Sequence, residues 1–411
     1  MTGQGAGKAA LTPARLALVG MGLVLAAHSA SLAAASFMRR SAPAIAAASF
    51  GDDAAAVRLA LPRQAVRETA LPRAEAFALA RRRLASEPLD ARALALMSLV
   101  ADPTGQSEAA ARYARLANKA SRRQPLAQLV MIGDRLHAGD IRGAIDNLDA
   151  IMRARPEARQ LVFPYARQTL ADSEVRQVFA EHIAKGSPWI FEFLSDAVNN
   201  KTSAPYVADV LVRGRQSLRP DMMSVYGPFF IARLLDGGAY DAVRSVVGLM
   251  PGGDAKVLAD AAFTRATTSK ALGGAAWQVA DNPDASAAFV QPAGGASPTL
   301  SIYAPGGANA VVAERRLLLP PGRYQIALRG SVSDGSIAQS ALPLAISCLD
   351  GAAGVILTQK DILPRLNAGF AGNFVVPADC KLQRIAISIE VPFSGEALDV
   401  TIERLSVTPA A

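Results

Sequence analysis

The sequence predicts a multidomain chain of α and β segments: an N-terminal transmembrane helix, an α-helical repeat domain and a C-terminal β-sandwich. Three patterns support this fold class. One apolar run, residues 16–38, is long enough to cross a bilayer as a helix. Apolar residues then recur at helical spacing over residues 55–271. Over residues 272–411 they alternate with a period of two, as in strands that bury one face.

Length and composition agree with several folded domains. The chain has 411 residues, of which 51% are hydrophobic and 19% charged, so a disordered protein is excluded. The net charge of +8 is concentrated at the front, because residues 1–123 hold 17 Lys and Arg against 8 Asp and Glu. Such a segment suits anionic headgroups or an anionic polymer, and the alternative is an arginine-rich helical surface in solvent. Zinc-ligand spacing and RNP-like aromatic motifs are missing, so we expect no nucleic-acid partner.

The apolar run determines the expected compartment. We predict a cytoplasmic tail at residues 1–15, an uncleaved transmembrane signal-anchor at 16–38 and a linker at 39–54. The alternative is a cleaved signal peptide, for which the alanine runs at 33–35 and 46–48 offer cleavage sites. In both cases the rest of the chain is exported. We therefore expect a single-pass inner-membrane protein with most of its chain in the periplasm.

Residues 55–271 are predicted to form a helical repeat domain. Prolines recur at Pro88, Pro125 and Pro156, at intervals of 37 and 31 residues. These intervals lie on either side of the period of about 34 residues that a tetratricopeptide repeat (TPR) has. The pattern therefore predicts a TPR-like α-solenoid. Stacked helical hairpins leave a concave groove, so we expect this domain to bind partner proteins.

The clearest repeat unit lies between Pro125 and Pro156. Gly139 is expected to form the turn between its two helices, because glycine adopts the left-handed backbone at low cost. The small side chain of Ala144 would let the two helices approach closely. The predicted apolar stripes are Leu129, Ile132 and Leu136 on the first helix, and Ala144, Leu148 and Ile151 on the second.

Residues 272–411 are predicted to form a jelly-roll-like β-sandwich. Four segments alternate apolar and polar residues and are separated by turns rich in Gly and Pro: 324–328, 342–348, 385–391 and 398–407. In the last segment the alternation of Leu398, Val400 and Ile402 changes phase at Leu405. A single extra residue in a strand has this effect, so the pattern predicts a β-bulge.

The two cysteines of the chain, Cys348 and Cys380, both lie in the predicted sandwich. Two cysteines in one β-rich domain of an exported protein favour a disulfide, and the alternative is a pair of buried thiols. Neither cysteine belongs to a CxxC motif or a Cys/His cluster, so we expect no metal site and no cofactor.

Two aromatic residues are candidate glycan contacts, Trp277 and Tyr324. Aromatic faces stack well on the apolar C–H face of a sugar ring. The alternative, which applies to Trp277 at the start of the domain, is that the ring fills the core of the sandwich. Few other aromatic residues in this domain are expected to be exposed.

A search for catalytic motifs gives no nucleophile elbow, zinc-protease helix or nucleotide-binding glycine loop. His137 and His182 lie on separate predicted helices and are interpreted as surface or packing residues. Carboxylates of the sandwich can in principle pair as in a glycosidase, although acids at turns are usually solvated. These acids are Asp334, Asp350, Asp361, Asp379, Glu390 and Glu396. We expect a non-enzymatic binding protein, and the alternative is a periplasmic polysaccharide-modifying hydrolase or lyase.

Several short motifs together resemble one family. They are Arg123-x-Pro-Leu126, Ile145–Arg153, Leu161-Val-Phe-Pro164, Pro188-Trp189 with Phe193-Leu194, Leu319-Pro-Pro-Gly-Arg-Tyr324, and Cys348 with Val376-Pro377 and Cys380. On these residues the chain resembles proteobacterial tetratricopeptide-repeat membrane proteins associated with exopolysaccharide gene clusters. The resemblance covers most of the chain after the predicted anchor. It implies a scaffold or adaptor of extracellular polysaccharide assembly or export, and none of its motifs is catalytic.

Overall fold

The computed structural model describes part of the chain. The described residues are 38, 41–50, 53–60, 71–101, 108–282, 284–291, 297–333, 339–351 and 354–410. The predicted transmembrane segment, residues 16–38, lies outside these residues except for Met38, and the predicted tail before it lies outside them entirely. Among the helices that the structure describes, none is both long and apolar enough to span a bilayer. The chain divides into two compact units, Met1–Leu161 and Val162–Ala411.

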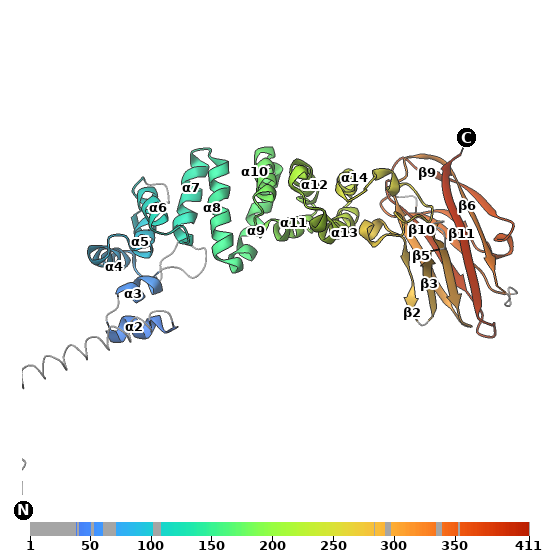
Figure 1. The fold of residues 1–411 in the computed structure, drawn as a ribbon, viewed down its shortest axis with the longest axis horizontal. Helices are drawn as coiled ribbons and strands as arrows, with labels where there is room; N and C mark the ends of the chain where they lie inside the picture. Colours follow the sequence, from blue (N-terminus) through green and yellow to red (C-terminus); the bar gives the residue numbers. More distant parts are fainter. Residues whose placement is uncertain are drawn as a thin grey trace, which may run out of the picture. The chain divides into compact units, whose positions relative to one another are not determined.

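The described part of the first unit is helical. Its helices are α2 (Pro43–Phe50), α3 (Asp53–Ala60), α4 (Arg73–Ser86), α5 (Ala91–Ala101), α6 (Glu108–Ala120), α7 (Pro125–His137), α8 (Ile141–Ala154) and the short η1 (Pro156–Ala158). From α4 to α8 each helix packs against the next one in the chain (Figure 1). Alanines at these contacts allow close approach, and Ala76, Ala80 and Ala93 are fully buried.

The predicted repeat unit between Pro125 and Pro156 is a pair of adjacent helices, α7 and α8 (Figure 1). Gly139 lies in the turn with a φ of 75°, the left-handed backbone expected of it. Asp140 begins the second helix, because its carboxylate accepts a hydrogen bond from the Gly143 N–H at 2.8 Å. Ala144 and Ile151 are buried, whereas Leu148 is half-buried.

The predicted stripe on α7 is wrong in its orientation. The helix buries Leu126, Ala127 and Met131, whereas Leu136 is 55% exposed. Ala127 and Leu126 pack in one cluster with residues of α5 and α6. Helix α7 therefore packs against α5 and α6 as well as against α8. The prediction considered only the contact between α7 and α8.

The second unit begins with helices and ends with the sandwich. Helix α9 (Arg159–Gln168) crosses the boundary between the units. The following helices are η2 (Thr169–Ala171), α10 (Ser173–Ala184), α11 (Ile190–Val198), α12 (Ala204–Arg213), η3 (Arg215–Ser217), α13 (Pro220–Asp236), α14 (Tyr240–Leu249), η4 (Ala255–Leu258) and η5 (Lys270–Ala275). Buried aromatic rings join the first of them, and Phe179 of α10 stacks on Phe193 of α11 with ring centroids 4.8 Å apart.

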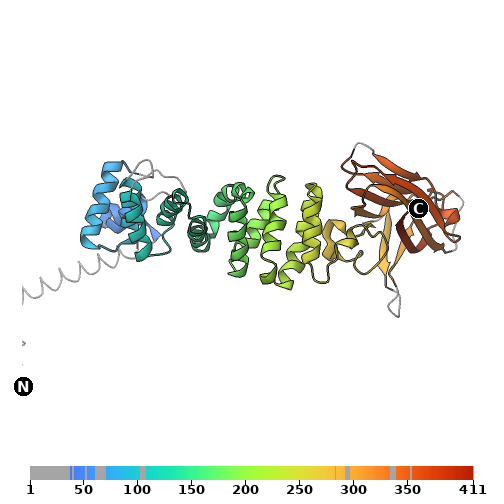
Figure 2. The ribbon, with the colours of Figure 1, turned by 90° about the horizontal axis from the view of Figure 1, so that it is seen from above.

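The sandwich consists of two antiparallel sheets, formed by the orange and red strands of Figure 2. The five-stranded sheet has the order β1 (Gln278–Val279), β5 (Asn309–Leu317), β10 (Gln383–Glu390), β7 (Leu344–Cys348) and β8 (Val355–Gln359). The six-stranded sheet has the order β2 (Asp281–Asn282), β3 (Ala285–Val290), β4 (Thr299–Ala304), β11 (Leu398–Pro409), β6 (Gly322–Val332) and β9 (Phe370–Val376). The short helix η6 (Leu363–Arg365) lies between β8 and β9. The coarse prediction of a helical segment followed by a β-sandwich is confirmed.

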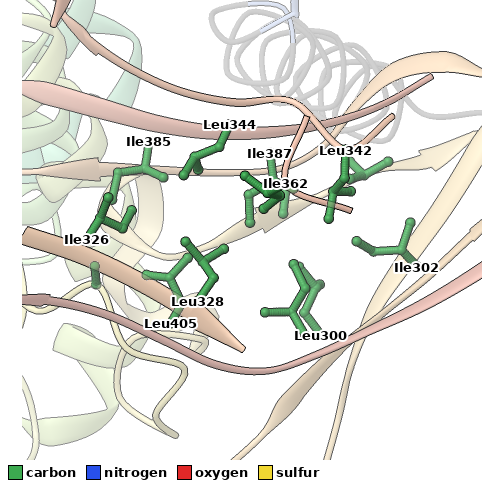
Figure 3. Packing of buried hydrophobic residues seen from close by; sticks show 14 of the residues in the cluster. Leu300, Ile302, Ile326, Leu328, Leu342, Leu344, Ile362, Ile385, Ile387 and Leu405 are labelled. Carbon is green, nitrogen blue, oxygen red and sulfur yellow. The ribbon is translucent and has the colours of Figure 1, made fainter. Parts of the chain in front are cut away.

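The core between the sheets is aliphatic. Side chains from both sheets point toward one another there, among them Leu300, Ile326, Leu328, Leu344, Ile385, Ile387 and Leu405 (Figure 3). Every second residue of a strand faces the same side, so the alternation in the sequence identified these positions correctly except for Leu300, which lies in a strand that was not predicted. The pairing of β11 with β6 shifts register between Ile402 and Arg404, which confirms the predicted bulge.

One buried arginine joins the helical segment to the sandwich. Arg315 of β5 is only 1% exposed, and its guanidinium donates to the carbonyls of Thr267 and Val257, both at 2.7 Å. Burial lowers the pKa of this guanidinium to about 10. Close by, the Leu318 N–H donates to the Leu258 carbonyl at 2.9 Å. The second compact unit, Val162–Ala411, includes residues on both sides of position 272, where the sequence predicts that the sandwich domain begins.

Replacing Arg315 with Ala is expected to destabilise the second unit. The change removes two charge-assisted hydrogen bonds and leaves a cavity, so we expect the free energy of unfolding to fall by about 3 kcal/mol. Arg316 is the matched control, since its ion pair with Asp236 is partly exposed, and Arg316→Ala should cost no more than about 1 kcal/mol. Denaturant unfolding followed by tryptophan fluorescence measures both, and equal effects would contradict the role given to Arg315.

Candidate functional site

The predicted disulfide is confirmed and lies at a rigid corner of the sandwich. Cys348 ends β7 and is bonded to Cys380, which lies in the loop before β10. Asp350 lies beside this bond and accepts hydrogen bonds from the N–H groups of Lys381 and Leu382, at 3.1 and 3.0 Å. The two sulfurs and the Asp350 carboxylate lie within 4.8 Å of one another. Metal ligation by cysteine needs thiolates, and bonded sulfurs do not provide them.

Gln383 connects the two loops at this corner. It is fully buried, its Oε1 accepts from the Leu319 N–H at 2.8 Å, and its Nε2 donates to the Cys380 carbonyl at 2.8 Å. The Tyr324 hydroxyl donates to the Pro320 carbonyl, also at 2.8 Å. The loop at residues 318–321 and the loop at 377–382 are therefore held together by buried side chains rather than by solvent-exposed contacts.

These two loops and α14 enclose a hollow of about 440 Å³, which we call the junction hollow. Its apolar wall combines three prolines with leucine and alanine side chains, and its polar residues come from α14 and the second loop. The lining residues are Pro205, Gly238, Ala239, Tyr240, Asp241, Ala242, Arg244, Leu319, Pro320, Pro321, Ala378, Cys380 and Lys381. All of them belong to the second unit.

Fixed charges surround the junction hollow. Arg244 pairs with Asp241 at 2.8 Å, whereas Lys381 has no ion pair within the described part of the chain. Tyr240 is half-buried and hydrogen-bonded to Asp350, and burial together with this bond raises the pKa of its phenol. The hollow therefore offers hydrogen-bond donors and acceptors next to a rigid apolar wall.

A larger hollow of about 530 Å³ has Arg315 among its lining residues. It is lined by Pro228 and Phe229 of α13 and by Glu314 and Arg316 of β5, among others. Its charged side chains take part in two ion pairs, Arg316 with Asp236 and Glu314 with Arg384, whereas Lys270 has no ion pair within the described residues. The junction hollow is the stronger candidate for binding because the Cys348–Cys380 disulfide and buried Gln383 hold its walls.

The two predicted glycan contacts are corrected by the structure. Trp277 is 4% exposed, its ring packs against Phe263, and its Nε1 donates to the Ala261 carbonyl at 3.2 Å. Tyr324 is 7% exposed and stacks on Phe374, and burial raises the pKa of its phenol. Both rings belong to the sandwich core, so their faces are covered and cannot stack on a sugar. The alternative interpretation of Trp277, a core residue, is the correct one.

Two exposed aromatic residues of the sandwich, Tyr303 and Phe393, were not identified from the sequence, nor was half-buried Tyr240 of α14 identified as a residue of the hollow. Phe393 is 94% exposed and its ring lies over Gly307, where a Cβ would come within 2.7 Å of it. The only local signal was an aromatic residue inside the turn Pro392-Phe-Ser-Gly395.

Two of the acids considered for catalysis, Asp350 and Asp361, accept hydrogen bonds from backbone N–H groups and thereby hold loops in place. Asp361 accepts from the N–H groups of Leu342 and Leu363, and Asp350 accepts from those of the second loop. Asp334 lies outside the described residues. The histidines lie far from the sandwich acids in sequence: exposed His137 contacts the Gly133 carbonyl, and buried His182 contacts the Ser187 hydroxyl.

No protein-family model matches the chain, and no curated protein matches it. Among solved structures, the carbohydrate-binding module CBM4 is 15% identical over 27% of this chain and 71% of its own, with a TM-score of 0.21. The module CBM61 in complex with β-1,4-galactotriose is 11% identical over 36% and 98%, with a TM-score of 0.25. Accessory secretory proteins 1, 2 and 3 of Streptococcus pneumoniae match at 12% identity over 33% and 86%, with a TM-score of 0.20. Similarity at this level carries no information about the ligand of this chain.

The raised pKa of Tyr240 predicts a pH dependence of stability. Below pH 10, the ordinary value for a tyrosine, the phenol is protonated in both the folded and the unfolded chain, and its stabilising contribution is fully present. Above that pH the unfolded chain loses the proton while the folded chain retains it, so stability falls as the pH rises. Tyr240→Phe should therefore make the free energy of unfolding decline less steeply above pH 10 than it does in the unchanged protein.

Tyr303→Phe provides the control, because Tyr303 is 49% exposed. Urea unfolding at a series of pH values between 9 and 11 measures the slopes. The assignment is contradicted if Tyr240→Phe and Tyr303→Phe change the slope equally.

Proposed function

We propose that this chain is a non-enzymatic binding protein of extracellular polysaccharide assembly or export. In this proposal its N-terminal segment anchors it in the inner membrane, its TPR-like helices dock partner proteins in the periplasm, and its jelly-roll-like sandwich contacts glycan. The observation that carries the glycan part is the junction hollow, where an apolar wall held by a disulfide lies beside the polar side chains of Arg244 and Lys381. The resemblance of the sequence supplies the cellular context.

The chemistry of the junction hollow suits a sugar. A sugar ring presents apolar C–H faces and a rim of hydroxyl groups, and the hollow places Pro320, Pro321 and Leu319 beside Arg244 and Lys381. Its volume of about 440 Å³ falls within the range of about 300–1,000 Å³ that is usual for small-ligand sites. The walls are held by a disulfide and a buried glutamine, so little conformational entropy is lost on binding.

The disulfide also supports the proposed compartment. Bonds such as Cys348–Cys380 persist in oxidising environments, including the bacterial periplasm, and are rare in the cytosol. The helical part supports partner docking in a general way, since hairpins such as α7–α8 stack to give extended surfaces.

Affinity electrophoresis of the full-length protein tests the glycan part. Native gels containing alginate, an acidic polysaccharide, or hydroxyethyl cellulose, a neutral one, should retard the protein relative to a gel without polysaccharide. The double variant Arg244→Ala/Lys381→Ala should lose most of this retardation, because it removes the polar donors of the junction hollow while leaving its buried walls intact.

The matched control is Lys360→Ala/Arg404→Ala. It removes the same charge from exposed positions of the sandwich that do not line the junction hollow. Retardation that both double variants lose equally would indicate general electrostatic attraction, and no retardation of the unchanged protein in either gel would reject the glycan part.

A further inference from the structure

The first unit contains a separate, strongly basic hollow of about 340 Å³, which we call the arginine pocket. Three turns contribute to it: the start of α5, the loop between α6 and α7, and the end of α8. Its lining residues are Asp90, Ala91, Arg92, Ser121, Arg123, Gln124 and Arg155. All of them lie in the first compact unit, so the pocket does not depend on the sandwich.

The periodicity of the sequence explains why these residues meet. Pro88, Pro125 and Pro156 each lie within four residues of a lining arginine, and each marks the start or end of a helix in successive hairpins. Because stacked hairpins place equivalent turns at the same edge, side chains that are more than 30 residues apart in sequence converge there. The pocket is thus a product of the repeat, although no motif within a single repeat reveals it.

The positive charge of the pocket is not neutralised within the described residues. Arg92 and Arg123 have no ion pair there, and Arg155 has only a loose contact of 3.7 Å with exposed Glu157. Asp90 is occupied elsewhere, since it accepts from Arg83 Nε at 2.8 Å and from the N–H groups of Arg92 and Ala93. Burial opposes ionisation of Asp90, but these hydrogen bonds outweigh it and hold its pKa below the usual value.

Gln124 is the second, independent sign of a ligand. The residue lines the pocket and is only 9% exposed, yet its Nε2 has no hydrogen-bond partner. Although Gln124 precedes α7, its side chain does not cap that helix. One turn later, the buried Gln128 donates from its Nε2 to Asn118 Oδ1 at 2.6 Å and to the Arg122 carbonyl at 3.0 Å. Buried amide donors are nearly always satisfied, so the unpartnered Nε2 of Gln124 is consistent with an acceptor that a ligand supplies.

We propose that the arginine pocket binds a phosphoryl group, either a phosphate or a diphosphate. Three guanidinium groups, an amide N–H and the Ser121 hydroxyl supply more donors than the two oxygens of a carboxylate can accept. A phosphoryl group has three terminal oxygens and close to two negative charges, and arginine recognises it in a planar, bidentate manner. This site is independent of the junction hollow and of the glycan contact proposed for it.

Isothermal titration calorimetry with inorganic pyrophosphate tests the site in the full-length protein. The titrations are carried out at a constant ionic strength of about 0.15 M, so that long-range attraction between exposed charges is screened. We expect saturable binding at one site. Arg123→Gln and Arg92→Gln should each weaken the affinity by about tenfold or more, and Gln124→Leu should weaken it by a smaller factor.

Arg122→Gln is the matched control. Arg122 is the chain neighbour of Arg123, is exposed and does not line the pocket, so the same charge is removed from the same loop. The affinity of this variant for pyrophosphate should stay within about twofold of the affinity of the unchanged protein, because an exposed charge outside the pocket is screened. Arg92 and Arg123 are themselves exposed, so their variants test the pocket even if Gln124→Leu fails to fold.

Two further ligands show whether the pocket selects a phosphoryl group over a carboxylate, and whether that phosphoryl group belongs to a lipid or to a free phosphate. Acetate at the same concentration should bind at least tenfold more weakly than pyrophosphate, since it offers fewer acceptor oxygens. Dihexanoyl phosphatidic acid, a soluble phosphate-headgroup lipid, should bind with the same dependence on Arg123; tighter binding than pyrophosphate assigns the site to lipid headgroups, and weaker binding assigns it to free phosphates. The proposal is overturned if pyrophosphate shows no saturable binding, if acetate binds as tightly, or if Arg122→Gln is as damaging as Arg123→Gln.

Discussion

The guanidinium of Arg315 is the contact on which the second unit depends. It extends from β5 to the backbone of the segment between α14 and the first strand, where its two terminal nitrogens each donate to a carbonyl. Burying such a cation is unfavourable unless its N–H groups find acceptors, so this segment is constrained to one position against the sheet. As a result, helix α14 and the loops of the sandwich can enclose a hollow with well-defined walls.

Local periodicity accounts for what the sequence predicted well. Strands of a sandwich bury every second residue, so the alternation of Ile385, Ile387 and Ile389 reports directly on burial, and its phase change in β11 located the bulge. The turn at Gly139 could also be predicted from the sequence, because few residues other than glycine adopt a left-handed backbone. In both cases the signal is contained within about ten neighbouring residues.

Contacts between distant segments account for what could not be predicted. Tyr240 and Asp350 lie on different elements, and nothing in the sequence near either residue indicates that they share a hydrogen bond. Trp277 could be recognised in the sequence as a candidate glycan contact because it is aromatic. Its burial, however, depends on Phe263 and the Ala261 carbonyl from the preceding segment. The orientation of α7 depended in the same way on α5 and α6, which a pairwise comparison with α8 did not take into account.

The arginine pocket has a mechanical consequence for the first unit. Its three arginines come from three different hairpin turns, so the spacing between them changes whenever neighbouring helices rotate or slide against one another. An anion held by all three would favour a single curvature of the stack, because a ligand shifts a conformational equilibrium toward the state it binds best. The binding of a small ion at one edge would then alter the surface that the same helices present elsewhere.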